Sequence, residues 1–138
     1  MSTIGLISFS IAIGINSIFL YNRKKRWNTS YLRWLTGIIL FIIALIAIYF
    51  KIIVDSDVSI FIGSFSAVLI YNTFDAILKT VSMRLHERDF YLWLRGSDEI
   101  NDSLHGKNPH IKLSDKVFSF FLLILIFTAP FLGYFFKL

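Results

Sequence analysis

One acidic residue lies inside an apolar stretch of the chain, and it is the first candidate for chemistry. Asp75 falls near the end of an apolar segment that begins at Val58. A carboxylate within a membrane span costs on the order of 3 kcal/mol to insert, and such residues often mark ion or proton pathways. A structural explanation competes, because Lys79 follows one helical turn later and a pair of this spacing near the membrane surface can hold both charges. The sequence leaves both interpretations open.

Polar side chains are predicted at a similar depth in all four apolar segments. The predicted intramembrane cluster consists of Asn16, Thr36, Asn72, Asp75, Lys79 and Ser119. Hydrogen bonds between such groups commonly hold membrane helices together, at roughly 0.6 kcal/mol each. The simpler interpretation is therefore helix packing. The alternative is a polar vestibule that opens to one side of the membrane.

Other residues that often carry chemistry form no recognisable motif. His86, His105 and His110 all follow the third apolar segment, and their spacing is not that of a zinc site. The chain contains no cysteine, which excludes thiolate catalysis and Cys-ligated metal. Glycine-rich phosphate loops and nucleophile elbows are also absent from the sequence. We therefore predict no catalytic residue, no metal site and no cofactor.

The elements that must position these residues are membrane helices. The chain has 138 residues, 56% of them hydrophobic, and its mean hydropathy is +0.67, too apolar for an ordinary soluble domain of this length. Apolar segments of membrane-spanning length cover about residues 4–21, 34–54, 58–78 and 117–136. The sequence thus predicts an all-α fold, a single domain (1–138) that is a bundle of four transmembrane helices.

The basic residues predict how the bundle is oriented and which molecules it contacts. Twelve of the 14 Lys and Arg residues lie in residues 22–33 and 79–116, the first and third connections. The positive-inside rule then makes these connections cytoplasmic, or matrix-facing in an organelle, and puts both termini outside, with the cell inner membrane as the expected location. The net charge of +5 flanks the spans, which indicates anionic lipids rather than nucleic acid as partner. Lipid headgroup contact is expected from Arg23, Lys24, Lys25 and Arg26.

Three further patterns concern the helices themselves. Apolar residues recur at helical spacing beyond Leu78, so we expect the third helix to extend into the cytoplasm as an amphipathic segment as far as about Arg95. Pro130 should disrupt the fourth helix near residues 127–128. Small residues recur every fourth position in the third span and predict a helix-packing face, within one molecule or between copies. They are Ser59, Gly63 and Ala67.

Function follows from the sequence only as a class. Polar and small residues suited to helix packing, without a reaction centre, favour a non-enzymatic subunit that acts by assembly or interaction within a membrane complex. Its expected partners are membrane lipids and either other membrane subunits or further copies of the same chain. The alternative is a homo-oligomeric channel, transporter or pore-forming membrane effector. Four helices enclose little water, so conduction would require several copies.

Overall fold

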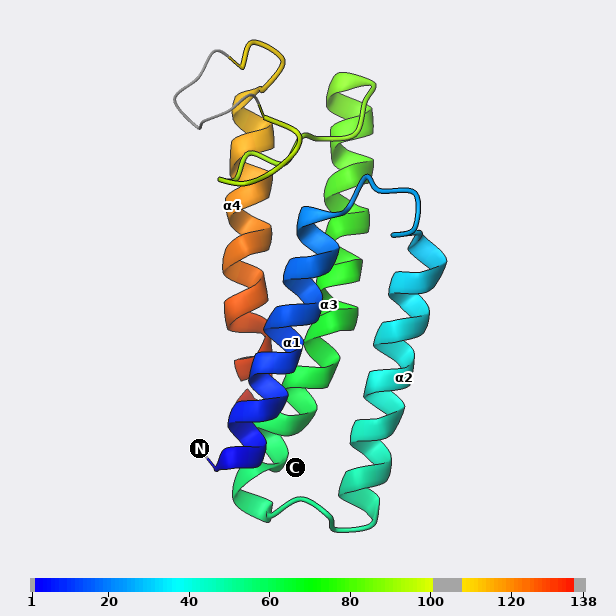
Figure 1. Cartoon of the computed structure of the whole chain (residues 1–138), viewed down its shortest axis with the longest axis vertical. Coiled ribbons are helices and arrows are strands. Elements are labelled where there is room, and N and C mark those ends of the chain that lie inside the picture. Colours follow the sequence, from blue (N-terminus) through cyan, green and yellow to red (C-terminus); the bar gives the residue numbers. More distant parts are fainter. Residues whose placement is uncertain (1, 101–107, 136–138) are drawn as a thin grey trace.

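The computed structural model describes residues 2–100 and 108–135, and within them the chain is helical, with no strand. The helices are α1 (Thr3–Tyr21), α2 (Ser30–Tyr49), α3 (Asp55–His86) and α4 (Leu113–Thr128), followed by the 3-10 helix η1 (Ala129–Phe135). They run up and down side by side, and the start of α1 and the end of η1 lie at the same end of the bundle (Figure 1). His105, Lys107, Lys137 and the predicted end of the fourth span lie outside the described residues.

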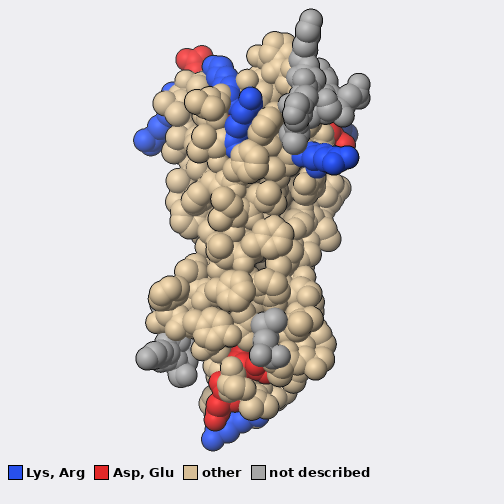
Figure 2. Space-filling model, turned by 90° about the vertical axis from the view of Figure 1, so that its left-hand side faces the viewer, with Lys and Arg blue, Asp and Glu red and all other residues tan. Residues whose placement is uncertain are grey.

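Four helices are long and apolar enough to cross a membrane: α1, α2, α3 and the continuous α4–η1 segment. The multi-span, all-helical prediction is confirmed to this extent. On the face drawn in Figure 2, charged side chains gather at the two ends of the molecule, and the broad band between them carries none. This distribution suits a bundle whose middle contacts hydrocarbon, because charge is costly there.

Helix α3 is the centre of the bundle. The other helices pack against it, whereas α2 has no other major contact among the described helices. Small residues let α2 approach α3: Gly37 lies against Leu69, and Ala44 and Ala47 are buried beside Phe65. A second core cluster joins α1, α3, α4 and the chain after α3.

The extension of the third helix is shorter than predicted. Helix α3 continues beyond Leu78 but ends at His86, and Glu87 adopts the left-handed conformation (φ 56°) that commonly terminates helices. At 32 residues it is roughly 48 Å long, well beyond the ~30 Å of a hydrocarbon core. The prediction that it reaches Arg95 is wrong, because the chain turns back after Glu87.

Residues 87–100, the return segment, form an irregular strip that packs on the bundle. Phe90, Leu92 and Leu94 are buried, and the intervening Tyr91 and Trp93 are only partly so. This alternation has a period of two residues, which is typical of extended chain and incompatible with a helical stripe. The buried side chains belong to the same core cluster as Tyr71 and Leu122, so hydrophobic burial favours the folded-back path.

The fourth span changes character at the predicted place. Helix α4 ends at Thr128, and η1 begins with Ala129 and Pro130. Proline has no N–H to continue the α-helical hydrogen bonds. The tighter η1 then packs along the early part of α3, where Gly63 faces Pro130 and Gly133.

The small-residue face is a contact within the molecule. A Cβ added to Gly63 would collide with the Pro130 carbonyl oxygen, and one added to Gly133 would collide with the Ser59 carbonyl oxygen. The two backbones are therefore in direct contact at Gly63 and Gly133, and Ala67 is fully buried one turn further along α3. This answers, for Ser59 and Gly63, the question that the sequence left open.

We expect Gly63→Ala to destabilise the bundle by about 1–3 kcal/mol, because the added methyl group must push apart two backbones. Gly14→Ala is the matched control, since a Cβ at Gly14 meets nothing within 4 Å. It should be neutral or stabilising by up to about 1 kcal/mol through helix propensity. Unfolding of both variants in detergent measures the difference, and equal stabilities would contradict the close backbone packing.

Candidate functional site

The carboxylate of Asp75 lies between two arginines at the end of the bundle where the first and third connections meet. One oxygen, Oδ1, accepts hydrogen bonds from Arg23 Nε and Nη2 at 3.2 and 3.1 Å. The other, Oδ2, accepts from Arg33 Nη1 at 2.6 Å. The side chain of Asp75 is only 2% exposed. We call Arg23, Arg33, Asp75 and Asp89 the arginine–aspartate cluster.

Arg23 uses all of its guanidinium nitrogens within this cluster. Nη2 also contacts Asp89 Oδ1 at 3.1 Å, and Nη1 donates to the Phe90 carbonyl oxygen at 2.9 Å. Its guanidinium carbon lies 3.7 Å from the centre of the Phe90 ring. Burial disfavours the charged form of Arg23, but the carboxylates of Asp75 and Asp89 outweigh this effect and raise the pKa of its guanidinium. The cation therefore persists at physiological pH.

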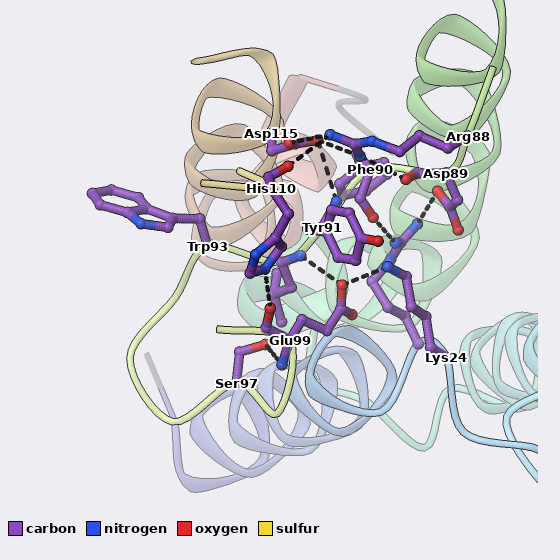
Figure 3. A network of polar contacts seen from close by, with 12 residues as sticks. Lys24, Arg88, Asp89, Phe90, Tyr91, Trp93, Ser97, Glu99, His110 and Asp115 are labelled. Carbon is purple, nitrogen blue, oxygen red and sulfur yellow. Dashed lines mark hydrogen bonds and ion pairs between the residues drawn. The ribbon is translucent and has the colours of Figure 1, made fainter. Parts of the chain in front are cut away.

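A second set of contacts fastens the return segment to the start of α4 (Figure 3). Arg88 forms a two-bond pair with Asp115, from Nη1 to Oδ1 at 3.2 Å and from Nη2 to Oδ2 at 2.8 Å. Asp115 also accepts from the backbone N–H groups of Tyr91 and Lys112. The hydroxyl of Ser119 accepts a hydrogen bond from the backbone N–H of Trp93, at 2.8 Å. Side chains thus satisfy backbone donors that have no helical partner, as buried chain requires.

The return segment is also tied to the connection between α1 and α2. Lys24 Nζ lies 2.7 Å from Glu99 Oε2, and the same oxygen accepts from the Leu92 N–H at 2.8 Å. Lys24 Nζ is 3.9 Å from the centre of the Tyr91 ring. This part of the network is visible in Figure 3 below the Arg88 pair. Ion pairs therefore join the return segment to α4 on one side and to the α1–α2 connection on the other, and its apolar side chains are buried in the core.

The predicted intramembrane cluster is only partly assembled. The Asn72 side chain donates a hydrogen bond at 2.8 Å to the backbone carbonyl oxygen of Arg33, the arginine that also binds Asp75. Ser119 contacts the return segment. Lys79 is exposed, and the Asp75 oxygens contact arginines rather than Lys79. Two positions remain apart from the others. The Thr36 hydroxyl donates to the Leu32 carbonyl oxygen in its own helix, and the side-chain amide of Asn16 is buried without a hydrogen-bond partner among the described residues.

The predicted lipid-contacting run has largely internal partners. Arg23 is buried in the arginine–aspartate cluster, so its guanidinium is not available to lipid headgroups. Lys24 and Lys25 pair with Glu99 and Asp98. Arg26 is exposed, with no hydrogen bond or ion pair to any residue in the described part of the chain. The sequence could not show which of these four basic residues are paired within the protein, because their acidic partners lie more than fifty residues away in the chain.

His86 and Ser114, a pair that the sequence did not indicate, come together where α3 ends and α4 begins. His86 Nε2 is 2.7 Å from Ser114 Oγ, and His86 Nδ1 is 3.1 Å from Lys112 Nζ. A lysine ammonium can only donate, so Nδ1 accepts and Nε2 carries the ring proton. This is the opposite tautomer to that of a histidine acting as base toward a serine. The contact therefore joins two helix ends rather than activating a nucleophile.

Comparison with protein-family models, with curated proteins and with solved structures found no match. The site must be interpreted from its own geometry. Both oxygens of Asp75 accept hydrogen bonds from arginine side chains, two at Oδ1 and one at Oδ2, which is the arrangement of a structural ion pair. The arginine–aspartate cluster connects four parts of the chain: the α1–α2 connection, α2, α3 and the return segment.

We expect Asp75→Asn to destabilise the folded protein by about 3 kcal/mol, because it leaves two inward-facing arginines with half of their counter-charge. Asp98→Asn is the matched control, since Asp98 pairs with Lys25 on the surface and such pairs contribute little. Denaturant titration of both variants in detergent tests this. Equal sensitivity of the two variants would remove the structural role assigned to Asp75.

Proposed function

We propose that the protein is a non-enzymatic subunit that works by association with other proteins in its membrane. The observation that supports this is an apolar surface on the ends of α3 and α4. There, Leu85 is 62% exposed, Leu113 77% and Val117 55%. These side chains have no partner element to cover them in the described part of the chain.

The position of this surface distinguishes it from ordinary lipid-facing residues. Arg23, directly after α1, and Arg33, near the start of α2, both contact Asp75, so the part of α3 beyond Asp75 extends past both helices. Figure 1 shows α3 and α4 rising together beyond α1 and α2. We call residues 76–86 and 113–120 the α3–α4 projection. Its two sides are joined at His86 and Ser114.

Helix lengths support placing the projection outside the hydrocarbon. Helices α1 and α2, with 19 and 20 residues, are roughly 28–30 Å long, which matches the bilayer core. Beyond their ends, exposed leucine and valine side chains would contact water or lipid headgroups. Exposed apolar patches in such positions commonly mark protein interfaces.

The proposed orientation places the projection in the cytoplasm and both termini outside, in agreement with the positive-inside rule. Because the chain has no cysteine, single cysteines report it cleanly. Cysteine at the exposed position Ser56 should react with a membrane-impermeant thiol reagent on intact cells. Cysteine at Arg26 should react only after the membrane is opened. The reverse pattern would require the opposite orientation.

Association itself is tested by the mass of the particle extracted from native membranes, compared with 16.0 kDa for one chain. We expect a complex of defined stoichiometry that is lost in Leu113→Lys. Tyr31→Lys is the matched control, because Tyr31 is equally exposed (76%) but lies on the first turn of α2, away from the α3–α4 projection.

A monomeric wild-type particle in both detergent and lipid nanodiscs would contradict the proposal. A particle built only from this chain would instead favour the alternative of a homo-oligomeric channel, transporter or pore-forming effector. Ion flux through liposomes containing the purified protein then separates a conducting oligomer from a structural one.

A further inference from the structure

We propose that a groove on α3, immediately beyond the start of α2, binds the headgroup of an anionic phospholipid. The groove has a volume of about 360 Å³ and is lined by Ala76, Ile77, Thr80, Val81 and Arg84. It is separate from the exposed leucines on which the proposed function rests, and it does not require a protein partner.

The depth of the groove matches the headgroup layer. Asn72 contacts Arg33 near the start of α2, so α2 begins at about the level of Ala76 on α3. The groove therefore starts where a neighbouring membrane helix stops. A lipid seated against α2 would have its phosphate at this height and its acyl chains below it.

The lining follows the order of chemical groups in a phospholipid. Thr73, Ile77, Thr80 and Arg84 recur at steps of four, three and four residues and so share one face of α3. Thr73, one turn below the groove, is exposed on the same face, and Ile77 is 48% exposed. An acyl chain can thus continue along α3 below the groove. Side chains on a helix tilt toward its N-terminus, so the Arg84 side chain extends back toward the level of the phosphate.

The charge of the groove selects the kind of lipid. The Arg84 side chain is exposed and forms no ion pair or hydrogen bond with any residue that the structure describes, in contrast to the side chains of Arg23, Arg33 and Arg88 at the same end of the molecule. No carboxylate is among the described residues that line the groove. A guanidinium pairs well with phosphate oxygens, and an anionic headgroup adds attraction that a zwitterionic one lacks.

Native mass spectrometry of the purified protein in neutral detergent, titrated with phosphatidylglycerol or phosphatidylcholine, tests the proposal. We expect preferential retention of one phosphatidylglycerol, weakened about fivefold in Arg84→Gln, the factor that corresponds to ~1 kcal/mol for one basic residue near an anionic surface. Arg26→Gln is the matched control, an exposed arginine without a described partner at the same end of the bundle but outside the groove.

Thr80→Phe adds a second, uncharged variant that fills the groove and should also weaken retention. Unchanged retention in both Arg84→Gln and Thr80→Phe would overturn the proposal, as would equal retention of the two lipids. A photoreactive side chain at position 80 that cross-links to protein instead of phospholipid in native membranes would also overturn it. Circular dichroism confirms that each variant is folded before it is compared.

Discussion

A carboxylate in a membrane bundle must find its counter-charge inside the protein, and Asp75 finds it in Arg23 and Arg33. Each arginine comes from a different part of the chain, so satisfying one buried charge fixes the α1–α2 connection and α2 relative to α3. Two cations around one anion leave an excess of positive charge. Asp89 reduces this excess from the return segment, which explains why that segment must lie over the end of the bundle. A buried cluster of charges is costly to form, and removing one of its partners is more costly still, because a buried charge is then left unpaired.

The return segment depends on this cluster but adds its own constraints. Phe90 contributes a carbonyl oxygen and a ring face to Arg23 while its side chain lies in the apolar core. Phe90 is thus held both by the Arg23 cation and by hydrophobic packing. On the other side, Asp115 accepts both the Arg88 guanidinium and backbone N–H groups. The apolar side chains of the segment, Phe90, Leu92 and Leu94, belong to the core cluster at the end of the bundle where a polar vestibule was the alternative prediction.

The sequence predicted the helices well and the cluster poorly, for physical reasons. Hydropathy reports on twenty-residue segments, so four spans and an elongated third helix could be recognised. Ion pairs between residues 23 and 75, or 24 and 99, depend on how distant segments meet, and local spacing instead favoured Lys79 as the partner of Asp75. The helical stripe was extended to Arg95 because Leu92 fitted its period. The two-residue alternation from Phe90 to Leu94 indicates extended chain. It was overlooked because the charged residues around Arg88 resemble the solvent-exposed face of a continuing helix.

The two ends of the bundle are stabilised by different means, and this difference bears on function. Near the chain termini, Gly63 and Gly133 bring two backbones into contact, and Ser2 binds Asp57 at the start of α3. Such packing tolerates little movement or added volume. At the other end the helices separate, and charges distributed over connections hold them together. This second end carries uncovered apolar side chains and Arg84, whose side chain has no partner among the described residues. A surface that recognises lipids or proteins is expected where the chain is held by side chains, because there new partners can be accommodated without moving the tightly packed backbones.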